Sequence, residues 1–405
     1  MPRPAPDARR TTRFAAMFAV GCAACTGDAG GSAQDIVLAD SAGVQIVTVR
    51  GLDPGDLPAW TLGADAAVEI GAADGPGHDL HWPRVASRLP GGAIIIANRG
   101  SNEIREFDAA GRYVRSLGRK GAGPGEFENL SWAGWLDGDT IVGYDPPNRR
   151  LTVFAPDGSV ARTVTLPLPH TSSFPEVAGI LANGSVLAYP GFDRVFSRGE
   201  RRDTIAYMIY PPDGSRADTL GSYAGPERFF HVLTDFALSM DVPFGRTAYA
   251  AARGTHVVLG SSDALALDLH DGNGALLRRI RIVIPPVPVT GSEAGAQRDS
   301  ATAAVPERVR DAYREMQDLA PRRETHPAFT ALALDDDGRI WVRLPGLTGA
   351  PADQWLILSS TGAPVGRMSI GAGLEIEEVG RDYVLIRSTA ADGVESIRLY
   401  SLSRG

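Results

Sequence analysis

Residues 75–118 read GPGHDLHWPRVASRLPGGAIIIANRGSNEIREFDAAGRYVRSLG, and much of this pattern returns further along the chain. The Gly-Pro-Gly that begins at Gly75 recurs 48 positions later at Gly123, and Asn98 aligns with Asp145 at a distance of 47 positions. Both copies hold short apolar runs that are separated by glycine turns. A repeat of about 40–50 residues built from short strands is typical of a β-propeller, in which each repeat forms a blade of four antiparallel strands.

Turn glycines extend the repeat through the rest of the chain, to the last residues. Six glycines stand where the first strand of a blade would turn into the second, with spacings of 46, 46, 70, 84 and 42 residues: Gly92, Gly138, Gly184, Gly254, Gly338 and Gly380. The sequence therefore predicts an all-β fold, a six-bladed β-propeller over residues 35–405. The segment Ile36–Val49 lies outside the repeats and alternates like a strand. We expect it to pair with the last blade and to help close the ring, because an open ring leaves exposed sheet edges.

The two long spacings indicate insertions. One insertion is divided between residues 189–203 and 226–244, within and after blade three. The larger one lies between blades four and five and contains one predicted helix, within a helical insertion of residues 292–321. This helix begins at Pro306, repeats apolar residues at helical spacing and ends at Pro321. We expect it to pack on the surface of the propeller; a moving lid is the alternative.

Residues 1–25 are typical of an export signal. A basic start is followed by the apolar run Phe14–Ala24, which is too short to span a bilayer. The chain has two cysteines, Cys22 and Cys25, and both lie at the end of this region. The residues before Cys22 resemble a bacterial lipobox, so we expect a lipid anchor on Cys22, with Cys25 as the second candidate and an ordinary cleaved signal as the alternative. Residues 26–34 would then form a flexible tether.

Charge and cysteine content restrict the kinds of partner. The formal net charge is −8, and removal of residues 1–21 takes away four Arg and one Asp, which changes it to −11. Nucleic-acid binding depends on neutralising phosphates, so we expect no nucleic-acid partner. The predicted folded region holds no cysteine, which leaves neither a disulfide framework nor a thiolate site there.

The first two repeats resemble the NHL-repeat family of six-bladed propellers. The motifs that carry the resemblance are Leu89–Gly92, Ile94–Asn98 and Gly121–Phe127. They cover about one and a half blades, whereas the later repeats keep only the turn spacing. The N-terminal cysteine and the layout are similar to secreted or lipid-anchored bacterial propellers, most of which have no assigned activity. The resemblance implies the fold, and the fold alone does not select a function.

The direction of the strands assigns the loops to two sides of the ring. The turn face carries the turns between strands one and two and between strands three and four. The loop face carries the blade-to-blade connections, the loops between strands two and three, and the insertions. Because loops on a rigid scaffold commonly carry binding residues, we predict a ligand site on the loop face, around the mouth of the central channel. Its candidate residues are His78, Asp79, His81, Arg99, Asn102, Glu126, Asp145, Arg149, Asp193 and Arg194.

These candidates suggest two kinds of chemistry, each with a structural alternative. His78 and His81 would supply two metal ligands, whereas a zinc site needs three or four. Arg99, Arg149 and Arg194 fit bidentate recognition of an anion, and pairing with neighbouring aspartates is the alternative. We therefore predict no metal site and no cofactor, with Ca or Zn as the exception to test.

The sequence contains neither a Gly-x-Ser-x-Gly elbow nor a phosphate-binding loop. We therefore predict an exported, lipid-anchored propeller that acts as a binding scaffold for a protein, peptide or glycan. We expect it to be a monomer at the bacterial cell envelope, on the periplasmic or outer surface. The alternative is a propeller enzyme, a metal-dependent lactonase-like hydrolase or a lyase, with its site at the channel mouth.

Overall fold

The computed structural model describes residues 34–71, 75–167, 174–191, 198–215, 217–232, 237–346 and 352–405. The predicted export signal, Cys22, Cys25 and the tether before Gln34 lie outside the described residues, as do Asp193 and Arg194. Residues Gln34–Gly405 form one compact unit.

The two sequence repeats form two four-stranded antiparallel sheets. Their strands are β5 (Pro83–Arg88), β6 (Ile94–Asn98), β7 (Glu103–Phe107) and β8 (Tyr113–Leu117), then β9 (Trp132–Leu136), β10 (Thr140–Asp145), β11 (Arg150–Phe154) and β12 (Val160–Thr165). All of β6 is buried. Ile94 and Ile96 pack into one apolar cluster and Ile95 and Ala97 into the next, because a sheet covers each side of this strand. The continuous apolar run is therefore explained by burial on both faces.

The next two sheets extend the four-stranded pattern. The third contains β13 (Pro175–Ile180), β14 (Val186–Pro190), β15 (Gly199–Tyr210), β16 (Asp218–Val232) and β17 (Ala237–Asp241). The fourth contains β18 (Ala248–Arg253), β19 (His256–Ser261), β20 (Ala266–Asp271) and β21 (Leu276–Ile282), with β1 (Asp35–Ser41) and β2 (Val44–Arg50) at its outer edge.

The remaining strands form one continuous nine-stranded sheet. One run is β22 (Ala331–Leu334), β23 (Ile340–Leu344), β24 (Ala352–Leu358) and β25 (Pro364–Gly371). The other is β26 (Glu375–Val379), β27 (Tyr383–Thr389), β28 (Glu395–Ser403) and β4 (Val68–Ile70). The short strand β3 (Ala59–Leu62), which follows the 3-10 turn η1 (Pro54–Asp56), joins the two runs.

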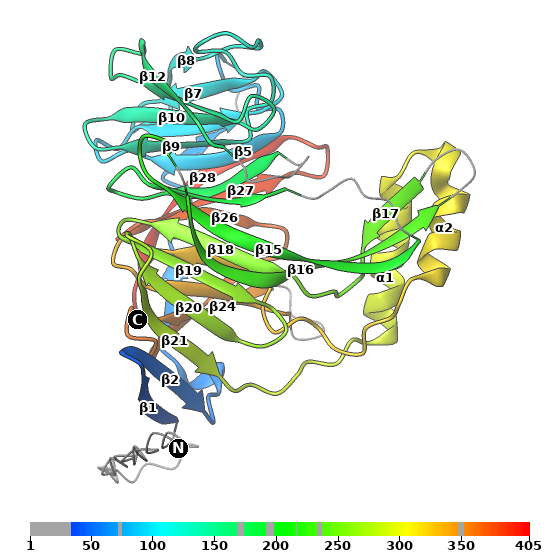
Figure 1. Cartoon of the computed structure of the whole chain (residues 1–405). Coiled ribbons are helices and arrows are strands. Elements are labelled where there is room, and N and C mark those ends of the chain that lie inside the picture. Colours follow the sequence, from blue (N-terminus) through cyan, green and yellow to red (C-terminus); the bar gives the residue numbers. More distant parts are fainter. Residues whose placement is uncertain are drawn as a thin grey trace, which may run out of the picture. The chain divides into compact units, whose positions relative to one another are not determined.

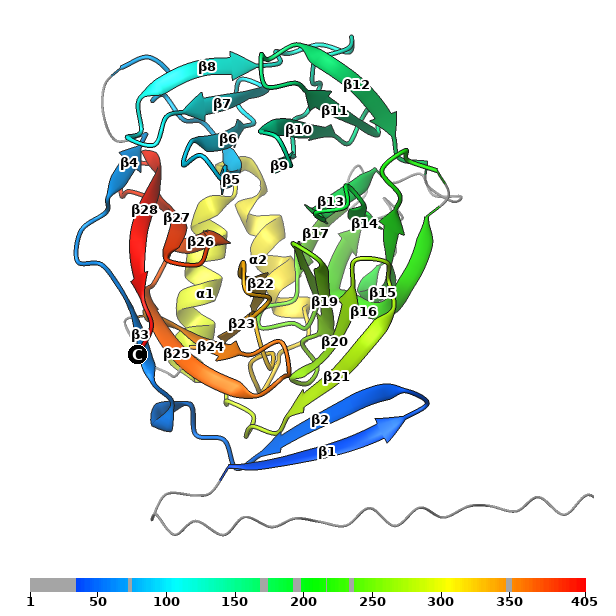
Figure 2. The same cartoon turned by 90° about the vertical axis from the view of Figure 1, so that its left-hand side faces the viewer.

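The first strands of these runs surround a central channel. β5, β9, β13, β18, β22 and β26 contact one another in this order, and β26 contacts β5 (Figure 2). Apolar clusters fill the spaces between neighbouring sheets. Each of the six turn glycines lies between one of these first strands and the strand that follows it. Curled antiparallel sheets around a common channel are the arrangement of a β-propeller.

The N-terminal segment joins the end of the chain. Ile70 of β4 lies opposite Ile397 of β28, and β3 pairs with both β28 and β25. The partner predicted for Ile36–Val49 was wrong, because these residues form the hairpin β1–β2 and β2 runs parallel to β21. Val47 and Val49 of β2 are buried in the core between the fourth sheet and β22–β25, which explains why the hairpin lies there.

The prediction of one inserted helix was also wrong in number. The insertion contains α1 (Gly291–Ala304), the 3-10 turn η2 (Glu307–Val309) and α2 (Arg310–Leu319). Of these, α2 corresponds to the predicted helix, and α1 was not predicted. Within the described part of the chain, no helix is long and apolar enough to cross a membrane.

We call α1 and α2 the roof, and we call the outer parts of β15 and β16 together with β17 the arm. Much of the insertion predicted in the third repeat, residues 189–203 and 226–244, forms the strands of this arm. Phe229 and Met240 of the arm pack against Met316 of α2. Figure 1 shows the roof beside the ring at the end of the arm, and Figure 2 shows it in line with the channel, behind the first strands. The roof is therefore held over the loop face.

Candidate functional site

The two Gly-Pro-Gly loops are each held by an arginine of the third strand. In the first copy, Arg105 Nη1 donates to the backbone oxygens of Gly77 (2.8 Å) and Asp79 (2.9 Å) and to Asp79 Oδ1 (2.7 Å). In the second copy, Arg150 donates to the backbone oxygens of Ala122, Gly123 and Glu126, at 2.9, 2.7 and 2.8 Å. Hydrogen bonding to Arg105 lowers the pKa of Asp79. The candidate Asp79 is thus one partner in the fastening of its own loop.

Asn102 and Asp145 satisfy backbone amides inside the repeat. Asn102 is 7% exposed and has a φ of 58°, and its Oδ1 accepts from the Leu130 N–H at 2.9 Å. Asp145 has no exposed surface and accepts from the N–H groups of Glu128 (2.8 Å) and Asn129 (3.1 Å). Buried polar groups need such partners, so both contacts are those of structural residues.

Glu126 and the two histidines also make local contacts. Glu126 accepts from the Gly123 N–H at 2.9 Å and pairs with Arg119, and these contacts lower the pKa of Glu126. His78 Nδ1 accepts from the Gly71 N–H at 3.3 Å, whereas the ring of His81 is stacked on Trp82 at 4.7 Å between centroids. No group of three or more His, Cys, Asp or Glu side chains with a metal-binding arrangement occurs among the described residues.

The candidates Arg99 and Arg149 make separate local contacts. Arg99 Nε donates to Asn129 Oδ1 at 2.6 Å, next to the loop that Asp145 fastens. Arg149 has a φ of 49°, and its backbone N–H closes a turn on Pro146.

Charged side chains that the sequence did not single out meet Arg99 at the loop-face end of the channel. Burial lowers the pKa of Arg84, and the positive charges of Arg99 and Arg387 lower it further, against the opposing effect of Glu176 and Glu395. Arg84 is the second residue of β5 and Glu176 the second residue of β13, at the ends of two first strands that face the loop side. We call Arg84, Arg99, Glu176, Arg387 and Glu395 the channel-mouth cluster.

Two members of this cluster have no partner of their own. Arg84 and Glu176 make no hydrogen bond or ion pair with any described residue. Burial raises the pKa of Glu176, because its carboxylate is partly removed from water. Arg387 differs, since its Nε donates to Glu377 Oε1 at 2.6 Å. The five donors of Arg84 thus have no described hydrogen-bond acceptor, although Glu176 and Glu395 lie near it as well as Arg99 and Arg387, and an arginine in this state has donors available for an anion.

Bulges in the first strands help to place these groups. The pairing register shifts between Pro83 and Ala86 in β5, and between Val177 and Gly179 in β13. An extra residue interrupts the alternation of side chains and changes the direction in which a neighbouring side chain points. The sequence signal for Glu176 and Arg387 was a single charged side chain in an otherwise uncharged strand, whereas β5 carries Arg88 besides Arg84.

Trp82 lies at the rim of the same mouth. Its side chain is 59% exposed, its φ is 52°, and its N–H donates to Glu395 Oε2 at 2.7 Å. A bulky residue at positive φ is strained, and such strain persists where the surroundings hold it in place. An exposed aromatic ring beside this cluster of arginines and glutamates is suited to stacking on a ligand.

At the opposite end of the channel, residues of several first strands line a cavity of about 230 Å³. Glu378 there is bonded to Arg253 at 3.0 Å and also accepts from the Arg88 N–H and the Tyr383 hydroxyl. Burial raises the pKa of the neighbouring Glu377. Arg253, Glu377 and Glu378 of this cavity are thus paired, in contrast to Arg84 and Glu176 at the loop face.

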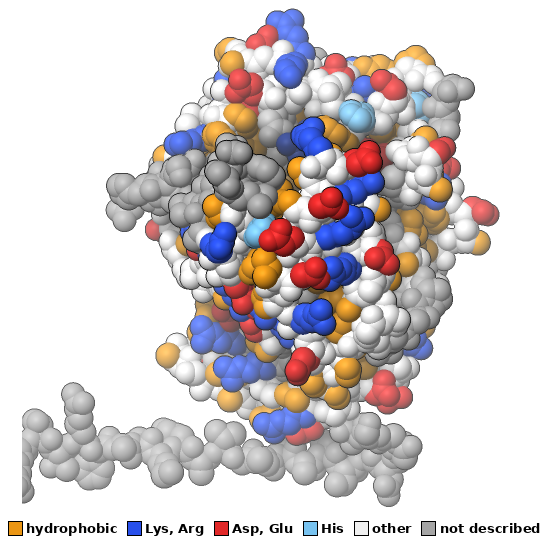
Figure 3. All heavy atoms as spheres, turned by 90° about the vertical axis from the view of Figure 1, so that its right-hand side faces the viewer, with side chains coloured by type: hydrophobic (Ala, Val, Ile, Leu, Met, Phe, Trp, Pro, Cys, Tyr) orange, Lys and Arg blue, Asp and Glu red, His pale blue; other side chains and the backbone are white. Residues whose placement is uncertain are grey.

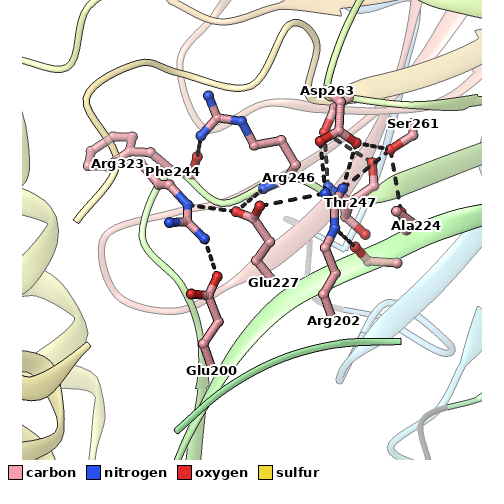
Figure 4. Close-up of polar contacts among 12 residues, drawn as sticks. Glu200, Arg202, Ala224, Glu227, Phe244, Arg246, Thr247, Ser261, Asp263 and Arg323 are labelled. Carbon is pink, nitrogen blue, oxygen red and sulfur yellow. Dashed lines mark hydrogen bonds and ion pairs between the residues drawn. The ribbon is translucent and has the colours of Figure 1, made fainter. Parts of the chain in front are cut away.

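An ion network fixes the arm to the ring (Figure 4). Glu227 of β16 accepts from Arg323 Nε at 2.8 Å and from the Arg246 N–H at 2.9 Å. Arg202 of β15 donates two hydrogen bonds to Asp263, at 2.8 and 2.6 Å. Because Arg323 follows α2 and Asp263 lies in the turn between β19 and β20 of the fourth sheet, the network joins roof, arm and ring.

The outer surface of the roof side shows no concentration of one charge. Basic and acidic side chains are interspersed across this face of the molecule (Figure 3). Arg298 pairs with Asp318 at 2.6 Å and Arg314 with Asp311 at 2.8 Å. Arg298 and Arg314 of these helices are thus paired with carboxylates, whereas Arg84 at the channel mouth pairs with no described residue.

Comparison with known proteins gives the fold and no activity. No known protein family matches the sequence as a whole or in part. A stretch of 61 residues is 34% identical to the RING finger protein nhl-1 of Caenorhabditis elegans, and it covers 15% of this chain and 6% of that protein.

Among solved structures, a member of the DUF4221 family from Bacteroides vulgatus is similar with a TM-score of 0.51 and 9% identity, over 85% of this chain and 99% of that one. A Bacteroides fragilis protein named as exported gives a TM-score of 0.48 and 12% identity, over 89% of this chain and 99% of that one. Virginiamycin B lyase from Staphylococcus aureus gives a TM-score of 0.39 and 11% identity, over 85% of this chain and 99% of that one. At such identities the likeness concerns the fold alone.

Proposed function

We propose that this chain is a binding protein of the bacterial cell envelope that recognises an anionic group of a peptide, protein or glycan at the channel mouth. It acts as a monomer, exported by its N-terminal signal and anchored by a lipid on Cys22 or Cys25. Its scaffold is a six-bladed propeller, for which the cyclic contacts of six first strands are the support. Binding requires no cofactor.

The free guanidinium of Arg84 is the observation that carries this proposal. Three arginines and two glutamates form the cluster, and Arg84 has no partner among the described residues. A carboxylate or sulfate would offer the paired acceptors that an arginine binds in a bidentate way. The exposed ring of Trp82 would stack on the attached sugar or side chain. Of the predicted site residues, Arg99 remains in this site, together with His81 through its contact with Trp82.

A pair of charged and neutral probes tests the proposal. We would titrate a galacturonate hexamer and an acidic hexapeptide into the protein, with the methyl-esterified hexamer and the corresponding glutamine and asparagine peptide as neutral partners. We expect at least one acidic probe to bind and its neutral partner to bind at least tenfold more weakly. Arg84→Ala should weaken the acidic probe about tenfold or more, since charge-assisted hydrogen bonds contribute about 1.5–3 kcal/mol.

Arg112→Ala is the matched control, because this arginine has an 81% exposed side chain and, among the described residues, pairs only with Asp108 on the turn face. It should leave binding unchanged. Equal binding of charged and neutral probes, no binding of either acidic probe, or an Arg84→Ala protein that binds as well as the wild type would each overturn the proposal. The anchor is tested separately by labelling cells with radioactive palmitate, which Cys22→Ala with Cys25→Ala should abolish.

A further inference from the structure

A second cavity lies outside the channel, at the loop-face end of the gap between the fourth sheet and β22–β25. Its volume is about 670 Å³. It is lined by Leu52–Gly55 before β3, by Ile284–Pro288 after β21, by Leu344 and Pro345 at the end of β23, and by Gln354, Trp355 and Arg367 of the paired strands β24 and β25. Cavities of about 300–1,000 Å³ with mostly apolar walls are typical of small-molecule sites.

The walls continue the apolar core between these sheets. Leu52 belongs to that core, and Ile284 and Leu344 pack against it. The cavity is therefore a place where the core between two sheets opens to solvent, and an apolar molecule that enters it would bury this surface.

Prolines and backbone bonds keep the cavity open. Five of the lining residues are proline, namely Pro54, Pro285, Pro286, Pro288 and Pro345. The strand-like segment around Val287 is held on one side by the His326 N–H, which donates to the Val287 backbone oxygen at 2.9 Å. Each proline fixes its own φ, so these walls cannot easily move inward to fill the space.

The polar side chains of the cavity are mainly donors without acceptors. Arg367 Nε donates to the Leu57 oxygen at 3.2 Å, whereas its two terminal nitrogens make no hydrogen bond with a described residue. Gln354 accepts from the Ser369 hydroxyl at 2.9 Å, and its amide nitrogen has no described partner. Gln354 lies opposite Ser369 and Leu356 opposite Arg367, so Gln354 and Arg367 share one face of the paired strands β24 and β25.

The acidic lining residue is already engaged. Asp53 Oδ1 accepts from the Gly55 N–H at 2.8 Å and caps the turn η1. Beside its apolar walls the cavity thus presents donors without a described acceptor, on Arg367, Gln354 and the buried indole Nε1 of Trp355, against one remaining carboxylate oxygen of Asp53. Its complement is a molecule with an apolar body and an oxygen anion.

We propose that this cavity binds a small apolar monocarboxylate, such as a medium-chain fatty acid, with its carboxylate on Arg367 and Gln354 and its chain against Leu52, Ile284 and Leu344. The site is separate from the channel mouth. Binding at this cavity does not depend on the anionic ligand or on the partner proposed for the channel mouth.

Calorimetric titration with octanoate, octan-1-ol and octylamine tests this site on the whole protein. We expect octanoate to bind at least fivefold more tightly than the alcohol and the amine to bind least. Arg367→Met should remove the preference for octanoate and leave the weak binding of the alcohol. Val287→Trp places a large ring in the cavity and should abolish both.

Arg112→Met controls for the loss of an arginine, and Arg84→Ala controls for the channel mouth; both should bind octanoate as the wild type does. Thermal unfolding of each variant shows whether it is folded, and Arg367→Lys provides a second variant that keeps the charge and should retain the preference. Equal affinity for octanoate and octanol in the wild type, or octanoate binding that survives Val287→Trp in a folded protein, would refute the site. Loss of octanoate binding in Arg84→Ala would place it at the channel mouth instead.

Discussion

Asp145 is a carboxylate with no exposed surface, and its oxygens accept hydrogen bonds from two backbone N–H groups and from Asn148 Nδ2 at 2.6 Å. An ionised side chain in such a position is stabilised by the donors that surround it. Asn98 takes the equivalent place in the first repeat, where it accepts from the His81 N–H at 2.8 Å. A side chain with an acceptor oxygen at this position therefore fastens the loop that enters each of the two blades.

Replacement of this carboxylate should be costly. Asp145→Ala leaves buried donors without an acceptor, and we expect the free energy of unfolding to fall by about 3 kcal/mol, because each unsatisfied buried group costs about 1–3 kcal/mol. Urea unfolding followed by tryptophan fluorescence measures it. Asp79→Asn is the matched control: the Asp79 side chain is 81% exposed, so its loss should cost less than about 1 kcal/mol. Equal losses in the two variants would contradict the structural role of Asp145.

Asp337 makes stability depend on acid. Hydrogen bonds from Arg339 and Arg404 lower the pKa of Asp337 to about 2, below the ordinary value of 3.8. A depressed pKa means that the carboxylate stabilises the folded state fully above about pH 4, and that this stabilisation is lost as the pH falls toward 2. Because the group is partly exposed, we expect no more than about 1 kcal/mol. The difference in unfolding free energy between wild type and Asp337→Asn should shrink from pH 5 to pH 2.5; a constant difference would argue against the pairing.

At the scale of elements, the sequence predicted strands and one helix well, because their patterns are local. The four strands of the first repeat were expected from alternation and turn glycines, and α2 from its apolar face. The other helix, α1, has no buried residue, so it lacks an apolar stripe to predict it. Its capping box at Thr290 and Glu293 was the available signal. The arm was taken for loop insertions because long strands outside a repeat have no spacing to reveal them.

The packing of the roof on the arm can be tested through one buried side chain. Met316 has no exposed surface and belongs to the apolar cluster that joins α2 to β16 and β17. Met316→Asp would bury a charge there, and we expect the roof to detach while the ring stays folded. Amide hydrogen exchange should then rise in α1, α2 and β17 and remain slow in β6 and β10.

The matched control for the roof is Leu319→Asp, three residues further along the same helix. Leu319 is 56% exposed, so a charge there should leave the exchange rates of the roof unchanged. If Met316→Asp raised exchange in β6 and β10 as strongly as in the roof, the roof would be part of one cooperative unit with the ring.

At the scale of the whole molecule, the site was harder to predict than the fold. Spacing along the chain gives the loop to which Arg99 belongs, but Arg84, Glu176 and Arg387 meet only because the ring brings distant first and second strands to one channel. Local contacts that satisfy Asp145 or Glu126 are equally invisible in a sequence pattern. The residues alone thus suggested a face of the molecule for a site, which stays a prediction, whereas the convergence of charges there depends on the closed arrangement of the sheets.

The ends of the ring are joined by the N-terminal strands β3 and β4, so their removal should affect the whole molecule. β4 supplies the outer strand beside β28, and Ile70 is completely buried in the core beneath it. Without residues 1–74, the edge of β28 and this core would be exposed, and exposed sheet edges pair with other chains. We expect that variant to unfold at lower urea concentration and to aggregate in size-exclusion chromatography, whereas a variant that begins at Gln34 should match the full chain.

A peptide of residues 52–71 separates loss of closure from loss of the hairpin β1–β2. Added in trans, it carries β3 and β4 but neither strand of that hairpin. If closure of the ring is the main contribution of residues 1–74 to stability, the peptide should restore a monomeric elution volume and much of the free energy of unfolding. The restored stability should rise with peptide concentration, because the peptide binds the folded state and not the unfolded chain. The two effects can be separated because β28 pairs with β3 and β4, whereas β21 pairs with the hairpin. If the protein without residues 1–74 stayed monomeric in the absence of the peptide, the remaining sheets would be sufficient to hold the ring together.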